Sequence, residues 1–252
     1  MLEHTEWAVV VGATGAFGKV MVERLLARGL GVVAVARSAA ALEALALAHP
    51  GRLVACVADI ASDACIDLIR AALPGTVRMV VHGPGVTAGG GVLTVDTGAM
   101  VEAVNIKVGG MLRLVRAVDD HLVVNSRLVA IGGHYGFEPT AYAGTAGVAN
   151  AALVNLVRQL SLAYGARGIT AHLLAPGPAD TDRLRRVAAE RARLQNTSTE
   201  QVLATMKAES SLGAFTEPGQ VAWALEMLLA PEASAMTGSS IMLDVGRRHG
   251  LP

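Results

Sequence analysis

Three glycines, Gly12, Gly15 and Gly18, close an apolar run near the start of the chain, and the residues after them carry apolar side chains at helical spacing. A strand, a tight turn and a helix start in this order suit a dinucleotide. One glycine makes the turn, one leaves room for the pyrophosphate, and one lets the helix pack closely on the strand. Free N–H groups and the positive dipole end of the helix stabilise the phosphates. The pattern therefore predicts nucleotide binding, with Thr14 and Phe17 in the same turn.

The ends of the second and third predicted strands carry the next candidate cofactor contacts. Arg37 and Ser38 end the second strand, where an acidic residue binds the ribose of NAD and an arginine suits the 2′-phosphate of NADP. Since no Asp or Glu stands at this strand end, we expect NADP(H) rather than NAD(H). The alternative is a surface arginine that caps the strand. Asp59 and Ile60 are expected to contact the adenine, unless Asp59 is a helix N-cap.

These residues must be positioned by strands that alternate with helices. Strands are predicted at 7–11, 31–37, 53–59, 77–82, 127–132, 170–175 and 240–245, and helices at 18–29, 39–48, 62–73, 97–118, 142–164, 183–209 and 217–230. This alternation favours an α/β fold with a doubly wound (Rossmann-type) parallel sheet of about seven strands and helices on both faces. No linker or repeat divides the chain, so one domain over 1–252 is expected.

The polar segment at about 180–212 is expected to cover the crevice beyond the strand ends as a substrate lid; the alternative is a connecting helix. Its arginines, interleaved with acidic residues, favour a solvated helix face or the attraction of an anionic substrate. Four apolar residues of the segment predict an apolar pocket or simply lid packing: Leu184, Leu194, Leu203 and Met206.

Composition limits the partners. Apolar residues make up 52% of the chain and the mean hydropathy is +0.47, yet polar residues interrupt every window long enough to cross a membrane. We therefore expect no membrane contact but a homodimer or homotetramer that buries apolar helix faces. The net charge is zero without a basic stripe, which excludes nucleic acid as an expected partner. Two cysteines make neither a disulfide framework nor a metal site, and residues 1–7 resemble no signal peptide, so a cytoplasmic protein is expected.

Several motifs follow one another in a recognisable order. They are the glycine turn, Asp59-Ile60, His82-Gly83-Pro84-Gly85, Asn105, Tyr142, Pro176-Gly177 with Thr181, and Thr237-Gly238 followed by Asp244-Val245-Gly246. In this order they resemble the short-chain dehydrogenase/reductase family over essentially the whole chain. The resemblance implies further cofactor contacts at Gly83, Pro176, Gly177 and Thr181. It also implies that Asn105 orders a water in a proton relay and that Tyr142 faces the substrate oxygen as proton donor or acceptor.

The sequence departs from the family pattern at its catalytic positions. The lysine expected four residues after the tyrosine is replaced by Ala146, and the serine expected after the fifth strand by Gly132-Gly133. The loop from there to Tyr142 is a few residues short. The nearest lysines lie in other elements, and Lys107, two residues from Asn105, is expected to point off that helix face.

Without the lysine, a tyrosine near its reference pKa of about 10 stays protonated at neutral pH. A phenol in that state donates a proton but is a poor base, which favours reduction over alcohol oxidation. His134 lies about where the serine is missing, and imidazole can donate, accept or act as a base; the alternative is a solvated or structural histidine. Tyr135 is an alternative phenol.

The sequence thus predicts an NADP(H)-dependent oxidoreductase that reduces a carbonyl or conjugated C=C of a largely apolar small molecule. Tyr142 is the expected proton donor, with Asn105 and His134 in supporting roles. Two alternatives stay open. One is a non-redox isomerase, cyclase or lyase that uses His134 and Tyr142, and the other is a catalytically silent NADP-binding protein.

Overall fold

The computed structural model describes residues 6–86 and 90–250 and contains one seven-stranded sheet. All neighbouring strands are parallel and run in the order β3-β2-β1-β4-β5-β6-β7. The strands are β1 (Glu6–Val11), β2 (Gly31–Ala36), β3 (Leu53–Val57), β4 (Thr76–His82), β5 (Leu122–Ile131), β6 (Thr170–Pro176) and β7 (Ser240–Leu243). The predicted doubly wound α/β fold is confirmed.

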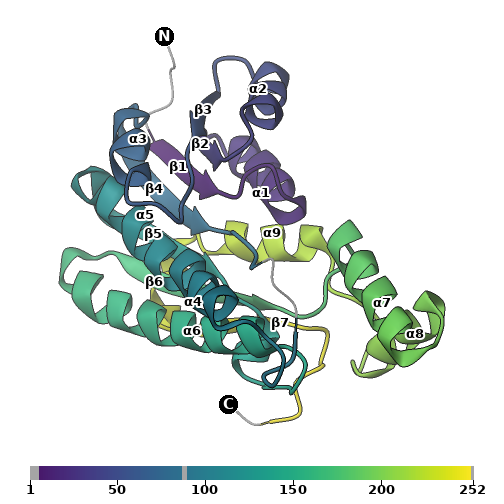
Figure 1. Ribbon diagram of the computed structural model, residues 1–252. Coiled ribbons are helices and arrows are strands. Elements are labelled where there is room, and N and C mark those ends of the chain that lie inside the picture. The colour runs from purple at the N-terminus through teal and green to yellow at the C-terminus, as the bar shows by residue number, and fades with distance from the viewer. Residues whose placement is uncertain (1–5, 87–89, 251–252) are drawn as a thin grey trace.

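Helices cover both faces of this sheet (Figure 1). They are α1 (Ala16–Ala27), α2 (Ala39–Ala48), α3 (Cys65–Ala71), α4 (Thr97–Val104), α5 (Gly110–Val118), α6 (Gly144–Tyr164), α7 (Asp182–Gln195), α8 (Thr199–Ala208) and α9 (Pro218–Met227). One apolar core joins the sheet to α3, α5 and α6, and the other joins it to α1, α2 and α9. Because both faces are buried, the strands are nearly continuous in Val, Ile, Leu and Ala.

The chain order places a ligand crevice at β1 and β4. From β1 the chain winds outward through β2 and β3, then returns to β4 on the other side of β1. The loops after these two strands therefore diverge, which is where open parallel sheets bind ligands. Backbone hydrogen bonds hold both loops: Gly12 N–H donates to the Val35 carbonyl and Gly83 N–H to the Val11 carbonyl.

Three predicted helices differ in detail from those observed. The stretch 97–118 is α4 and α5 joined by a single turn of π-helix, η1 (Asn105–Gly109). The stretch 183–209 is two helices, because Asn196 adopts a left-handed conformation between α7 and α8. Helix α6 begins at Gly144, so Tyr142 lies in the turn before it rather than in its first turn.

Helices α7 and α8 lie together beside the sheet (Figure 1). They share a small apolar cluster of Leu184, Ala188, Ala192, Val202 and Met206, against which Leu203 packs, whereas the side chain of Leu194 lies outside the described residues. Arg247, which follows β7, is buried; it forms an ion pair with Glu209 and donates to the Met206 carbonyl at 2.8 Å. This contact fastens the end of α8 to the segment after β7.

Several buried polar groups stabilise the frame. The guanidinium of Arg127 on β5 is 1% exposed and donates to the carbonyls of Leu228 and Ala230 and to the Thr170 hydroxyl. It thereby ties the end of α9 to the sheet. Both cysteines are buried. Burial raises the pKa of the Cys56 thiol, and it raises the pKa of the Cys65 thiol to about 11.

Two observations bear on membranes and targeting. Across 6–86 and 90–250, none of the helices combines the length and apolar character that crossing a bilayer requires. Residues 1–5, on which the expectation of no signal peptide partly rests, lie outside the described residues.

Candidate active site

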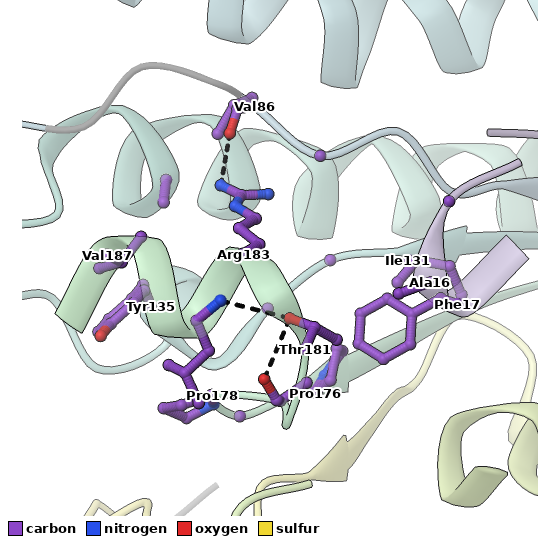
Figure 2. A pocket seen from close by; sticks show the side chains of 18 of the residues that line it. Ala16, Phe17, Val86, Ile131, Tyr135, Pro176, Pro178, Thr181, Arg183 and Val187 are labelled. Atoms are coloured by element: carbon purple, nitrogen blue, oxygen red, sulfur yellow. Dashed lines mark hydrogen bonds between the residues drawn. The ribbon is translucent and has the colours of Figure 1, made fainter. Parts of the chain in front are cut away.

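A cavity of about 510 Å³ opens between the glycine turn, the ends of β4, β5 and β6, and helix α7. This volume is within the usual range for small-molecule and cofactor sites. Figure 2 shows side chains from these separate elements around the same space, among them Phe17, Ile131, Thr181 and Arg183. The cavity therefore occupies the position that the sheet topology indicates.

The glycine turn has a shape that larger residues would destroy. Gly12 adopts φ +83°, a backbone conformation that favours glycine. A Cβ at Gly18 would lie 2.1 Å from the Gly12 carbonyl oxygen, so the helix packs on the turn without any side chain between. Gly15 is the N-cap of α1 and offers no side-chain cap, and the first turn of α1 contains no acidic residue. Its N–H groups and dipole therefore suit an anion such as a pyrophosphate.

Of the predicted cofactor residues, most line the cavity. These are Gly12, Gly15, Phe17, Gly18, Gly83, Pro176, Gly177 and Thr181. Five do not line it: Thr14, Arg37, Ser38, Asp59 and Ile60. Their cofactor roles stay predictions.

The structure gives two of these five residues local contacts. The Ser38 hydroxyl accepts from Ala41 N–H and caps α2. The Asp59 carboxylate accepts from Ala61 N–H, which makes it a turn residue, whereas Ala64 is the N-cap of α3. Arg37 is exposed at the end of β2, beside the glycine turn.

Lys107 is the cavity residue that the sequence interpretation missed. It is 4% exposed, and its Nζ donates to the Ile131 carbonyl at the end of β5 at 2.7 Å. Burial, followed by the positive charge of Arg183, lowers the pKa of Lys107 from 10.5 to about 7. An ammonium with this pKa gains and loses its proton near neutrality.

Asn105 does not line the cavity. Its side chain and that of Lys107 lie on different faces, as the sequence predicts, but Lys107 is the one that lines the cavity. The Asn105 side-chain amide donates to the Ala61 carbonyl at 3.1 Å and to the Glu102 carboxylate at 3.0 Å, and its oxygen accepts from Arg113 at 2.9 Å. The sequence interpretation placed Asn105 toward the substrate, but in the structure it is Lys107 on η1 that faces the cavity. The proposed relay role of Asn105 stays a prediction without a cavity contact.

Helix α6 presents Ala146 and Asn150, four residues apart, to the same cavity. Asn150 is 6% exposed, and a Cβ at Gly133 would lie 2.9 Å from its Nδ2. This part of α6 is thus a wall without a phenol or an ammonium. Tyr142 lies four residues, or about one helical turn, before Ala146 and therefore does not belong to this wall. In the sequence, the shortened loop before Tyr142 indicated this displacement.

His134 and Tyr135 follow β5 and line the cavity. His134 is 3% exposed; it hydrogen-bonds the Pro176 carbonyl, and its Nε2 is buried without a partner among the described residues. Nδ1 is therefore the donor to Pro176, and Nε2 is an acceptor. Burial first, then Arg247, lowers the pKa of His134 to about 4, so the imidazole is neutral at pH 7.

Tyr142 lies in a second hollow of about 280 Å³, which it shares with His134, Tyr135 and Arg247. The Tyr142 and Tyr135 hydroxyl oxygens are 3.3 Å apart, and Tyr135 lines both spaces. The Arg191 guanidinium lies 4.0 Å from the centre of the Tyr142 ring. For Tyr142, burial acts to raise the pKa, but the hydrogen bond with Tyr135 and the positive charge of Arg191 outweigh burial and lower the pKa. For Tyr135, burial raises the pKa.

The wall formed by α7 is cationic. Arg183, Arg186 and Arg191 line the cavity, whereas Arg185 and Arg193 form ion pairs with acidic residues of their own segment. Figure 2 shows Arg183 crossing from α7 to the carbonyl of Val86, to which it donates. Leu184 and Met206 line the same space, so the predicted lid residues border it in part.

Comparisons with known proteins agree with this arrangement. Residues 12–248 match the family described as enoyl-(acyl carrier protein) reductase. The chain is 26% identical over 245 residues to the 3-oxoacyl-[acyl-carrier-protein] reductase FabG of Salmonella typhimurium, covering 95% of this chain and 96% of that protein. It is 26% identical over 253 residues to the short-chain reductase protein NovJ of Streptomyces niveus, covering 95% and 93%.

Two solved structures are also similar. One is the NADPH-bound structure of a short chain oxidoreductase from Pseudomonas aeruginosa PAO1 that contains an atypical catalytic center. It is 25% identical, with a TM-score of 0.85 and coverage of 97% of each chain. The other is L-sorbose reductase from Gluconobacter frateurii, in complex with NADPH and L-sorbose. At 18% identity, a TM-score of 0.87 and coverage of 98% of each chain, it bears on the fold alone.

Proposed function

The chain belongs to the short-chain dehydrogenase/reductase family, and on that premise we propose that it is an NADP(H)-dependent reductase. Its substrate is a largely apolar small molecule with a carbonyl or conjugated C=C. One observation carries the proposal: a single cavity joins the glycine turn to the polar residues that follow β5 and β6. A phosphate-binding turn and proton-donating groups at one site are what a hydride-transfer enzyme requires.

The residues present fit a nicotinamide dinucleotide. The turn at Gly12, Gly15 and Gly18 leaves space and free N–H groups for a pyrophosphate, and Gly177 and Thr181 line the same cavity. Arg37 is proposed to bind the 2′-phosphate, which favours NADP(H) over NAD(H). When bound, the reduced nicotinamide supplies a hydride. Two similar proteins support this proposal: one is a short chain oxidoreductase whose solved structure contains NADPH, and the other is a 3-oxoacyl-[acyl-carrier-protein] reductase.

The proton donor proposed from the sequence is Tyr142. Its hydroxyl lies in the second hollow, so the contact with Tyr135 at 3.3 Å is its route to the cavity. In this arrangement Tyr135 would hand a proton to the substrate and regain one from Tyr142, while neutral His134 accepts a hydrogen bond at Nε2. The homo-oligomer and the cytoplasmic location stay predictions.

The test has two stages. NADPH and NADH binding are first titrated by cofactor fluorescence. NADPH oxidation is then followed with ketones, aldehydes, 3-oxoacyl thioesters and conjugated enones, for the wild type, Tyr135→Phe and Tyr142→Phe. The proposal expects tighter binding of NADPH than of NADH and oxidation that depends on an added substrate. Binding without oxidation by any compound would favour the catalytically silent alternative, and no NADPH binding would remove the proposal altogether.

A further inference from the structure

We propose that Lys107, rather than the Tyr135–Tyr142 pair, is the catalytic proton donor of the reduction. The inference deepens the reductase proposal and rests on it. Three observations carry it: Lys107 is buried, it lines the cavity, and α6 offers only Ala146 and Asn150 to that space.

The position of Lys107 follows from η1. In this π-helical turn, the backbone directs Lys107 toward the end of β5, where Nζ donates one of its three hydrogens to the Ile131 carbonyl at 2.7 Å. Two hydrogens remain for other acceptors. The Ile131 carbonyl fixes the ammonium beside Gly132 and Gly133, which add no side chain between it and the cavity. A substrate oxygen in the cavity can therefore be reached by Nζ.

A buried ammonium without a counter-ion is costly, so its presence in a cavity indicates a function. Within 6–86 and 90–250, no carboxylate forms an ion pair with Lys107. Two titratable groups interact with Lys107: Arg183 from α7, which is itself a cation, and His82 from β4. His82 bonds the Ile106 carbonyl through Nε2 at 3.0 Å, and burial, then the Lys107 charge, lowers its pKa to about 3. It is neutral at pH 7 and does not stabilise the ammonium.

The proton balance of the step is simple. The carbonyl carbon would be reduced by a hydride, with its two electrons, which a bound reduced nicotinamide would supply and thereby be oxidised. As the charge on the carbonyl oxygen grows, an N–H bond of Lys107 breaks and an O–H bond forms, which gives the alcohol and a neutral amine. The amine regains its proton from water. A pKa near the working pH is the most effective for such an acid.

Two variants separate catalysis from structure. Lys107→Gln keeps a donor for the Ile131 carbonyl but cannot give up a proton, and Lys107→Met fills similar space without a donor. We expect both to fold and to bind NADPH within about threefold of the wild type. We expect both to lose about 100-fold or more in kcat/KM for the best carbonyl found, the usual scale of general-acid catalysis. Lys19→Gln, on the exposed side of α1, is the matched control and keeps full activity.

The pH profile supplies a second readout. The wild-type kcat/KM for reduction should stay level at low pH and fall about tenfold per pH unit above pH 7, because the reactive form is the ammonium. Lys107→Gln should lose this inflection. If Lys107→Gln keeps wild-type activity, or if Tyr135→Phe alone removes the inflection, Lys107 is only a structural donor and the proposal is wrong.

A third readout needs no substrate. Acetic anhydride acetylates only neutral amines, so its reaction at Lys107, quantified by peptide mass spectrometry across pH, reports the titration of Lys107. We expect Lys107 to titrate near pH 7 and NADPH to slow its acetylation without affecting that of Lys19. A Lys107 that does not titrate near pH 7, or no protection of Lys107 by NADPH, would overturn the inference. If no compound is reduced by the wild type while Lys107 is protected, the reductase proposal fails but the placement of Lys107 at the cofactor stands.

Discussion

Gly18→Ala tests the glycine turn most directly, because backbone atoms rather than flexible side chains surround the added atom. The new Cβ would lie 2.1 Å from the Gly12 carbonyl oxygen and 2.7 and 2.8 Å from backbone atoms of Ala13. Real contacts of a Cβ are not shorter than 3.0 Å, so the turn must open by about 1 Å.

Forced overpacking costs about 1–3 kcal/mol, and the upper value applies where backbone must move. For a chain of this size, about 3 kcal/mol lowers Tm by about 6–12 °C. The same displacement separates the N–H groups of the turn from a pyrophosphate. A loss of about 3 kcal/mol in binding corresponds to a roughly 100-fold weaker Kd for NADPH.

The assay is a thermal melt followed by NADPH titration at a temperature where the variant is folded. Gly219→Ala is the matched control: nothing lies within 4 Å of its added Cβ, and the position is helical in α9. It should gain about 0.5–1 kcal/mol from the lower entropy of the unfolded chain and leave NADPH binding unchanged. A Gly18→Ala protein as stable and as tight for NADPH as the wild type would refute this account of the turn.

Three further outcomes are expected. Arg37→Ala should weaken NADPH binding about 10- to 100-fold and leave NADH binding unchanged, which paired titrations check; equal losses for both cofactors would contradict the 2′-phosphate role. Burial lowers the pKa values of His82, His134 and His172 from 6.5 to about 3, about 4 and about 4. Below pH 6.5 the unfolded chain therefore binds more protons than the folded one. The free energy of unfolding should fall toward pH 4 by up to about 1.4 kcal/mol per pH unit for each histidine, and urea titrations at pH 7 and 5 that agree would speak against neutral buried imidazoles. Arg127→Met removes two buried hydrogen bonds and one part-buried one, and should lower the free energy of unfolding by about 3 kcal/mol, with NADPH affinity retained in the folded fraction.

The sheet was predictable because each strand is specified by a short stretch of sequence. Each strand is an apolar run bounded by turn residues, and the alternation with helices leaves few topologies open. The glycine turn was predictable for the same reason, since three glycines at fixed spacing determine the backbone path. Only the ends differ: β5 begins at Leu122 rather than 127, where the exposed Val123 and Val124 gave no alternating pattern.

The walls of the site were harder to predict, because they depend on helix phase. A regular helix over 97–118 leaves open which of its faces meets the sheet, and the π-turn at η1 changes the phase again. The Gly109-Gly110 pair was the available signal, since adjacent glycines weaken a regular helix. A shift of one helical turn determines whether Tyr142 lies in the cavity or in the second hollow. The loop before it has no periodic pattern from which this position could be predicted.

The two covered cysteines give the protein an experimental advantage. Cys56 and Cys65 lie in the core with raised pKa values, so neither presents a thiolate to a thiol-reactive dye at neutral pH. Leu212, just beyond α8, is 75% exposed. A Leu212→Cys protein would therefore accept a single fluorophore without removal of the native thiols, and its emission would report whether α7 and α8 shift when a dinucleotide enters.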